Sequence, residues 1–137
     1  RKFLILSPLL KKEINEILID LDKKNLKLPI PIKWEYISNL EKKAHKNNEV
    51  FLDRETLKSP ISLRKYKNGD YFYPSGMKGK KLLSKFFKDE KYSLLDKEEQ
   101  WLLCSNGEIV WIIGKRCDDR FLARPNTKNK LLMRDLR

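Results

Sequence analysis

The chain has 137 residues, of which 40% are apolar and 36% are charged, so it has enough hydrophobic side chains for one compact unit. It contains no apolar run of the ~20 residues that a membrane-spanning helix needs, and its basic residues are spread over strand and loop segments, which argues against a membrane partner. The 31 Lys and Arg against 19 Asp and Glu leave a net charge of +12, which favours a polyanion such as nucleic acid.

Cysteine and histidine are too few for a structural metal site. The two cysteines, Cys104 and Cys117, form no CxxC pair, and His45 is the one histidine, so the four ligands of a zinc site cannot be assembled. Cys104 lies in an apolar segment, and a chain with this much core does not depend on disulfides. We therefore expect no metal, reduced thiols and a cytoplasmic protein.

Residues 1–60 are predicted to be rich in β-structure. Residues 2–6 have the composition of a strand, and their apolar run is too short for the core of a signal peptide. Residues 30–36 alternate apolar and polar side chains with period two, as a half-buried strand does, with Pro31 near its start or edge.

Two segments of this region are harder to assign. Residues 13–20 fit either a helical face or a buried strand, and the dense run Ile17-Leu18-Ile19 favours the strand. Residues 38–48, which include an exposed His45, are predicted as a helix fragment or a solvated connection. A strand at 50–52 follows them.

The pattern changes after Pro60. Residues 61–66 are predicted as a strand, 68–70 as a turn and 71–73 as an aromatic segment that Pro74 ends. A glycine-containing loop follows at 75–79.

Two short helices are predicted next. Leu82, Leu83, Phe86 and Phe87 form one apolar stripe with helical spacing. Ser93 followed three residues later by Asp96 resembles a capped helix start. We expect both helices to lie on a sheet.

The clearest element is a hairpin formed by 101–105 and 108–113. Asn106-Gly107 between two apolar runs favours the two-residue turn that matches the twist of the strands. Both faces of the hairpin are apolar, so it should be central and covered on both sides. The turn predicts the pairs Cys104 with Ile109 and Leu102 with Trp111 on one face, and Leu103 with Val110 on the other.

Together these elements predict an α+β fold, a β-rich, sandwich-like mixed sheet with two short helices packed on it. The chain divides into a β-rich segment at 1–60, a domain at 61–127 and a basic tail at 128–137, which are expected to share one compact unit.

Residues 69–87 carry the strongest signal of a binding site, because glycines, a proline and lysines precede a predicted helix. If the helix starts near Gly79 or Lys80, the lysines at 78, 80 and 81 lie at the positive end of its dipole. Cations around free N–H groups there would suit a bound phosphate, whereas the plain alternative is a solvated charged turn. Lys81, Lys85 and Lys88 would form a positive row along the helix.

The aromatic segment offers a second kind of contact. Tyr71, Phe72 and Tyr73 could stack on bases, as aromatic side chains do in single-stranded RNA recognition. Alternation along an extended chain buries at least one of the three, so a core role is the competing interpretation.

Catalytic motifs are missing from the sequence. The spacing of a nucleotide P-loop is not met around Gly69 or Gly79. Asp118 and Asp119 are adjacent carboxylates, but Arg116 and Arg120 flank them, which favours an ion-pair network over acid–base chemistry. With one histidine and no nucleophile motif, we expect no catalytic residue in this chain.

Residues 63–121 contain an ordered series of motifs by which the chain resembles the C-terminal domain of bacterial tRNA(Ile)-lysidine synthetases. The preceding residues resemble the Bacteroidetes form of that family. The motifs are Leu63-Arg64, Gly69-Asp70-x-Phe72-x-Pro74-x-Gly76-Met77-x-Gly79, Lys81-Leu82 with Phe86-Phe87, Ile109-Val110-Trp111, Gly114-x-Arg116 and Arg120-Phe121.

The resemblance implies a parent ligase that uses ATP with magnesium to join lysine to C2 of the wobble cytidine in an isoleucine tRNA with a CAU anticodon. The family's N-terminal catalytic domain carries a Ser-Gly-Gly-x-Asp-Ser pyrophosphate loop. Here Ser75-Gly76 is followed by Met77, so catalysis does not carry over to this chain and no cofactor is expected in it. The C-terminal domain is implied to grip the tRNA acceptor stem beside the catalytic domain of the same chain. Its fold is implied to be similar to a tRNA-binding element of the phenylalanyl-tRNA synthetase β chain.

A tRNA-binding module is therefore the preferred interpretation. The alternatives are an RNA-binding module of another RNA-processing protein, or a protein-interaction or dimerisation domain. A homodimer is the oligomer considered. The side chains predicted to bind RNA phosphates are Arg64, Lys78, Lys80, Lys81, Lys85, Lys115, Arg116 and Arg120. The residues predicted to shape the loop are Gly69, Pro74, Gly76 and Gly79.

Overall fold

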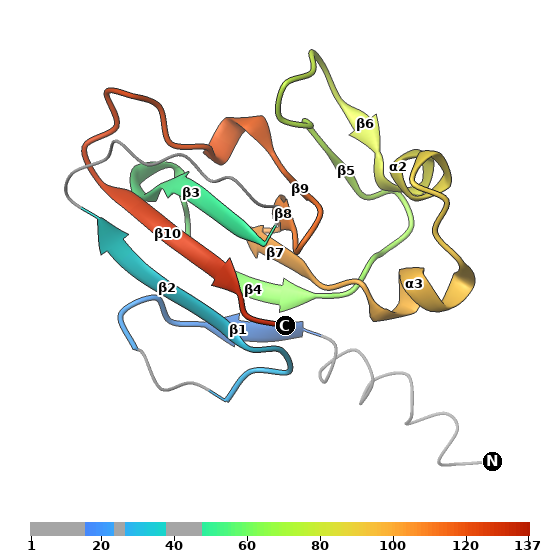
Figure 1. The fold of residues 1–137 in the computed structure, drawn as a ribbon, viewed down its shortest axis with the longest axis horizontal. Coiled ribbons are helices and arrows are strands. Elements are labelled where there is room, and N and C mark those ends of the chain that lie inside the picture. The colour runs from blue at the N-terminus through green and yellow to red at the C-terminus, as the bar shows by residue number, and fades with distance from the viewer. Residues whose placement is uncertain (1–15, 24–26, 38–47) are drawn as a thin grey trace.

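The structure is a computed structural model that describes residues 16–23, 27–37 and 48–137. These residues form strands, two α-helices and two 3-10 turns (Figure 1). In chain order they are β1 (Glu16–Ile19), β2 (Ile32–Ile37), β3 (Glu49–Asp53), η1 (Arg54–Thr56), β4 (Ile61–Arg64), β5 (Tyr71–Phe72), β6 (Lys81–Leu82), α2 (Leu83–Asp89), α3 (Leu94–Glu99), β7 (Leu102–Ser105), β8 (Glu108–Ile112), β9 (Arg116–Cys117), η2 (Asp119–Phe121) and β10 (Lys130–Asp135).

Two antiparallel sheets enclose the main core. One has the strand order β1-β4-β7-β8-β9 and the other β2-β10-β3. Apolar side chains from both sheets pack together, as in a sandwich. The largest of these side chains that are fully buried are Leu52, Leu63, Leu103, Trp111, Ile113 and Leu131.

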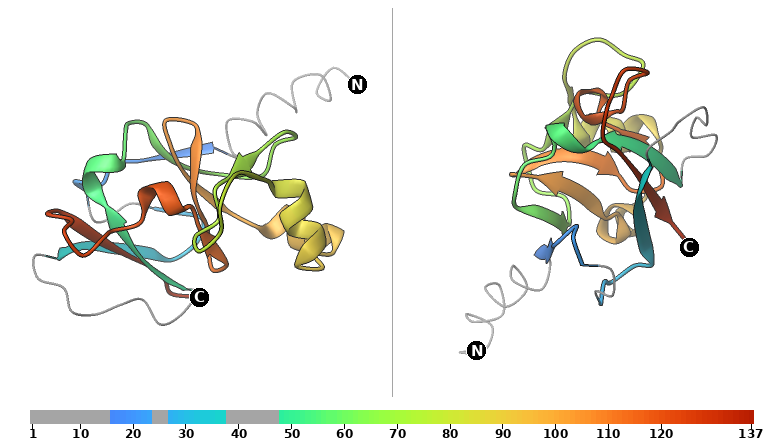
Figure 2. Two further views of the ribbon diagram at one scale, coloured as in Figure 1. Left: turned by 90° about the horizontal axis from the view of Figure 1, so that it is seen from above. Right: turned by 90° about the vertical axis from the view of Figure 1, so that its left-hand side faces the viewer.

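A second core covers the other face of the five-stranded sheet. Phe72 of β5 and the apolar stripe of α2 pack on Leu102, Cys104, Ile109 and Ile112 of the hairpin. In Figure 1 and in the left view of Figure 2, β5, β6 and α2 lie at one end of the molecule, away from β2 and β3. The prediction that the hairpin is covered on both sides is confirmed.

The hairpin turn is as predicted, but its register is not. Asn106 and Gly107 both have positive φ, 48° and 86°, as the expected two-residue turn requires. Cys104 pairs with Ile109 as predicted, whereas a β-bulge then shifts the register. Val110 is the extra residue, so the predicted pairs of Leu102 with Trp111 and Leu103 with Val110 are wrong. The observed pairs are Leu102 with Ile112 and Leu103 with Trp111.

The β-rich character of the first 60 residues is confirmed where the structure describes them. The preferred strand within 13–20 is β1, the alternating segment is β2, and the predicted strand at 50–52 is β3. The predictions for residues 2–6, for 38–47 and for His45 fall outside the described residues.

Residues 128–137 are predicted as a basic tail, but residues 130–135 form a strand. This strand, β10, lies between β2 and β3, and Leu131, Leu132 and Met133 are buried. The N-terminal residues also complete the larger sheet, because β1 pairs with β4. Both sheets thus combine strands from either side of Pro60.

The two helices are present, and the α+β class is confirmed. Helix α2 begins at Leu83, later than the predicted start near Gly79 or Lys80, because residues 81–82 pair with β5 as strand β6. Helix α3 has the predicted capping box between Ser93 and Asp96, but it buries no side chain. None of the described helices is long and apolar enough to cross a membrane.

Candidate nucleic-acid interface

The loop between β5 and β6 is fixed at its base by β9. The Arg116 Nη2 donates to the Ser75 carbonyl at 2.7 Å, and the Ser75 N–H donates to the Cys117 carbonyl at 3.0 Å. Pro74 forms an isolated β-bridge with Asp118. Gly76 and Gly79 have φ of 78° and 85°, which only glycine adopts without strain, as the predicted loop geometry requires.

Asp118 is the buried anchor of this region. Its side chain is fully buried and accepts hydrogen bonds from the Tyr73 N–H at 2.9 Å and from the Arg120 N–H at 2.8 Å. The Arg120 guanidinium donates two more, at 3.0 and 3.1 Å. The predicted ion-pair network is therefore present, although Asp119 pairs with Arg124 and Arg116 binds the loop carbonyl instead.

Arg120 lies between acidic and aromatic groups. Its guanidinium carbon is 4.2 Å from the centroid of the Tyr73 ring, and its Nη1 donates to the Glu108 carboxylate at 2.7 Å. Burial by itself would lower the pKa of Arg120, but hydrogen bonds and attraction from Asp118 and Glu108 outweigh it and raise that pKa. Arg120 thus stays a fixed cation with part of its surface open to solvent.

Two aromatic rings accompany these cations at the surface. Tyr71 is exposed and Tyr73 is half-buried, and their rings meet edge to face at 6.1 Å. Phe72 between them is fully buried, so the alternation predicted for this segment is confirmed. The Lys80 Nζ lies 4.6 Å from the centroid of the Tyr71 ring, within cation–π range.

The predicted lysines do not all have the same surroundings. Lys78, Lys80, Lys85 and Lys115 are exposed, whereas Lys81 is half-buried and forms an ion pair with Asp89 at 2.7 Å. The predicted helix start near Gly79 or Lys80 is wrong. Lys78, Lys80 and Lys81 all precede α2, which begins at Leu83.

Lys115 contacts an aromatic ring that itself packs against α2. Its Nζ is 5.9 Å from the Tyr92 ring, which stacks on Phe87 at 4.6 Å. The exposed lysines of the loop, of α2 and of the turn before β9 therefore belong to the same end of the molecule.

Arg64 is not at the surface. It is buried on β4 and forms two hydrogen bonds with Asp70, so the structure does not place it with the exposed lysines. Its inclusion among the phosphate-binding residues is not supported by this position. The sequence offered one signal of this pairing, since the two opposite charges are only six residues apart and Asp70 lies in the turn predicted at 68–70.

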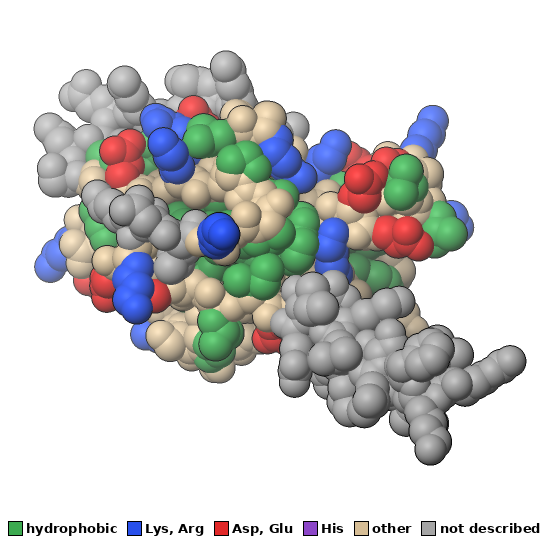
Figure 3. All heavy atoms as spheres, turned by 90° about the horizontal axis from the view of Figure 1, so that it is seen from below, with side chains coloured by type: hydrophobic (Ala, Val, Ile, Leu, Met, Phe, Trp, Pro, Cys, Tyr) green, Lys and Arg blue, Asp and Glu red, His purple; other side chains and the backbone are tan. Residues whose placement is uncertain are grey.

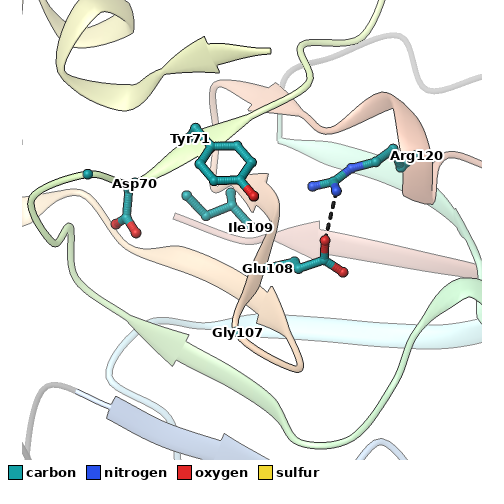
Figure 4. A pocket seen from close by; sticks show the side chains of 7 residues that line it. Asp70, Tyr71, Gly107, Glu108, Ile109 and Arg120 are labelled. Atoms are coloured by element: carbon teal, nitrogen blue, oxygen red, sulfur yellow. Dashed lines mark hydrogen bonds and ion pairs between the residues drawn. The ribbon is translucent and has the colours of Figure 1, made fainter. Parts of the chain in front are cut away.

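A shallow pocket of about 90 Å³ opens between the Tyr71 ring and the hairpin turn. Figure 4 shows the Tyr71 hydroxyl directed toward Arg120, with the Arg120–Glu108 ion pair on the opposite wall. Gly69 and Gly107 contribute backbone without side chains. Sequence reasoning missed Glu108, because nothing local shows that the hairpin turn meets the strand of Tyr71.

Basic residues do not form a continuous patch on every face of the molecule. On the face seen from below in Figure 3, Lys and Arg side chains lie among hydrophobic and acidic ones. The β5–β6 loop stands on the opposite side, at the top of Figure 1. The arrangement of cations and aromatic rings around that loop is the feature that suits a nucleic acid.

Two further kinds of group could carry chemistry, metal ligands and thiols. No three His, Cys, Asp or Glu side chains in this part of the chain are arranged to hold a metal ion. Cys104 and Cys117 are free and buried, and burial raises the pKa of the Cys104 thiol to about 11.

Residues 61–133 match the family described as the TilS substrate C-terminal domain. Similar proteins include the tRNA(Ile)-lysidine synthase of Parabacteroides distasonis, 38% identical over 135 residues, which covers 97% of this chain and 31% of that protein. The enzyme of the same name from Bacteroides thetaiotaomicron is 42% identical over 80 residues, covering 58% and 19%. That from Clostridium tetani is 32% identical over 124 residues, covering 88% and 26%. The chain thus spans less than a third of the length of these relatives.

A crystal structure of a TILS C-terminal domain has the same fold. Its TM-score with this chain is 0.68 at 20% identity, and the alignment covers 80% of this chain and 90% of that one. The sheet-rich fold with two short helices is therefore one already seen in a solved structure.

Proposed function

This chain belongs to the family of TilS substrate C-terminal domains, and from that membership we propose that it binds tRNA with the end of the molecule that carries the β5–β6 loop. The resemblance inferred from the motifs at 63–121 is confirmed, in its Bacteroidetes form as well. The relatives are named as acting in lysidine synthesis, so isoleucine tRNA is the RNA that we propose.

The observation that supports this proposal is the exposed Lys80 ammonium over the exposed Tyr71 ring in an anchored loop. Lys78, Lys85 and Lys115 add exposed positive charge at the same end of the molecule. Each phosphate that such a cation neutralises releases condensed counterions, which strengthens binding at low salt. Because Arg116 and Asp118 fix the loop beforehand, little ordering is needed when RNA binds.

For the whole protein we propose an ATP-dependent ligase of the cytoplasm that attaches lysine to the wobble cytidine of an isoleucine tRNA. ATP and magnesium would act in its catalytic domain, and we assign neither to the residues of this chain. The part of the fold described here would hold the tRNA, at the acceptor stem, while the chemistry proceeds elsewhere in the protein.

Equilibrium binding of the 137-residue chain to isoleucine tRNA with a CAU anticodon tests the proposal. We expect affinity to fall linearly on a log–log plot against salt, and to be higher than for a tRNA of another identity. Replacing both Lys78 and Lys80 by Gln should reduce the salt slope by about one for each lost phosphate contact. Lys33→Gln, on β2 of the other sheet, serves as the matched control and should leave the slope unchanged.

Two results would contradict this function. Binding that does not change with salt would exclude phosphate contacts as its basis. Equal affinity for every tRNA would instead favour a general RNA-binding module.

One observation favours a protein contact as a second candidate. Leu94 and Leu95 on α3 are the most exposed apolar side chains of the two helices, at 72% and 61%. We predict that the chain forms a homodimer through this surface. Sedimentation equilibrium of the chain, and of a variant in which both leucines are replaced by Lys, tests this prediction.

A further inference from the structure

We propose that the pocket between Tyr71 and the hairpin turn binds one unpaired cytosine base of the RNA. This inference rests on the tRNA-binding function proposed above, and it adds a base-reading site to the phosphate contacts. It comes from three features of the pocket: an aromatic wall, a carboxylate acceptor and a neighbouring guanidinium.

The wall of the pocket can stack on a planar ring. Tyr71 is 41% exposed, and its ring stands over Ile109 at the pocket (Figure 4). RNA-binding proteins stack unpaired bases on rings of this kind, and the stacking does not depend on which base is present. Gly69 and Gly107 at the rim carry no side chain that could block the entrance.

The pocket is small, about 90 Å³, and it is open to solvent. Part of a base bound there would therefore stay in water.

The polar groups of the pocket distinguish cytosine from uracil. Glu108 accepts from Arg120 with Oε2, and its Oε1 has no hydrogen-bond partner among the described residues. A carboxylate oxygen accepts from the N4 amino group of cytosine, whereas it repels the O4 carbonyl at the same position of uracil.

Arg120 complements this acceptor. Its guanidinium has five N–H donors, of which three are used by Asp118 and Glu108. Those that remain can donate to the N3 and O2 acceptors on the same edge of cytosine. One base edge could thus meet a fixed acceptor and a fixed donor side by side.

Electrostatics argues for a base rather than a phosphate at this point. Asp70 is neutralised by Arg64, but the exposed carboxylate of Glu108 would weaken any nearby phosphate contact. In a chain with a net charge of +12, an acidic group on the RNA-facing end is consistent with recognition of an amino group.

The experiment compares two RNAs with the same backbone charge. Fluorescein-labelled octamers of cytidine and of uridine are titrated with the chain at neutral pH, and binding is followed by fluorescence anisotropy. We expect the cytidine octamer to bind on the order of tenfold tighter, the usual discrimination of one good base contact. Amide signals of Gly69 and Gly107 should shift in NMR spectra with the cytidine octamer.

Four variants locate the effect. Glu108→Gln should bring the affinity ratio close to one and raise uridine binding, because Gln can donate to O4 and carries no charge. Tyr71→Leu should weaken both octamers by a similar factor, since stacking is shared, whereas Tyr71→Phe should retain binding. Tyr36→Leu removes another exposed tyrosine, on β2, and should change neither affinity.

Each contrary result has one meaning. Equal affinity for the two octamers in the unmodified chain, or an unchanged ratio in Glu108→Gln, would overturn the cytosine pocket while leaving salt-dependent tRNA binding in place. Failure of the chain to bind tRNA or either octamer would overturn both the pocket and the proposed function.

Discussion

Arg64 and Asp70 form a buried ion pair with two parallel hydrogen bonds, of 2.8 and 3.0 Å. Burial by itself would lower the pKa of Arg64, but the bonds to Asp70 and nearby negative charges raise it. Asp70 also accepts from the Lys67 N–H, and its carbonyl accepts from the N–H of Leu83, the first residue of α2. The pair therefore joins β4, the turn after it and the start of the helix.

We expect Arg64→Met to destabilise the chain by about 3–5 kcal/mol, because Asp70 would be left as a buried charge without its partner. Urea denaturation measures this change. Arg134→Met is the control: Arg134 is about half exposed and its ion pairs with Glu35 and Glu49 are long, so its loss should cost about 0–1 kcal/mol. Similar losses in the free energy of unfolding in the two variants would show that the buried Arg64–Asp70 pair stabilises the chain no more than an exposed pair does.

Lys81 should control the titration of Asp89. The hydrogen bond from Lys81, more than the charges of Lys85 and Lys88, lowers the pKa of Asp89. A lowered carboxyl pKa contributes stability that is present above the unfolded-state value and is lost as the pH falls through the folded-state value. We expect Lys81→Gln to raise the pKa of Asp89 toward its ordinary value in an NMR titration of side-chain carboxyl groups. Lys85→Gln should have a smaller effect, and an equal effect would mean that net charge alone sets this pKa.

The stability of the chain should depend on the packing of the second core and not on the exposed side chains of α3. Phe87 is fully buried and contacts the rings of Tyr66, Phe86 and Tyr92. We expect Phe87→Ala to cost about 3–5 kcal/mol in chemical denaturation. Leu94→Ala, at an exposed position of α3, should change stability by no more than about 0.5 kcal/mol. A large loss in the second variant would show that α3 is buried in solution.

Asp118 should matter more than its neighbour Asp119. Asp118→Asn places an amide N–H₂ among groups that donate to a carboxylate, and it loosens Arg120 from Tyr73. We expect a loss of about 2–4 kcal/mol in the free energy of unfolding, together with weaker tRNA binding. Asp119→Asn affects an exposed pair with Arg124 and should cost about 0–1 kcal/mol. Equal stability of the two variants would argue against Asp118 as the anchor of the loop.

Features that depend on a few neighbouring residues could be predicted from the sequence. Asn106-Gly107 specified its own turn, the Ser93–Asp96 capping box formed as expected, and the buried Phe72 followed from alternation. In each case the deciding interactions lie within a few residues of each other.

Features that depend on strands far apart in the chain could not be predicted from the sequence. The bulge at Val110 is accompanied by a hydrogen bond from the Asp118 N–H to the Val110 carbonyl, which becomes visible once β9 is placed beside β8. The charges at Lys130, Arg134 and Asp135 looked like a tail, whereas pairing with β2 and β3 makes a strand of them. The same limit applied to Glu108, whose partner lies on a later segment.

The position of β10 has a consequence for how the protein is made. This strand lies between β2 and β3 but follows every other described strand in the chain. On a ribosome, β1, β4, β7, β8 and β9 can assemble as soon as they emerge, whereas β2 and β3 present unpaired N–H and C=O groups until residues 130–135 have been translated. A stalled or shortened nascent chain would therefore expose two unpaired strand edges and the apolar face beneath them. We expect chaperones to bind such a chain.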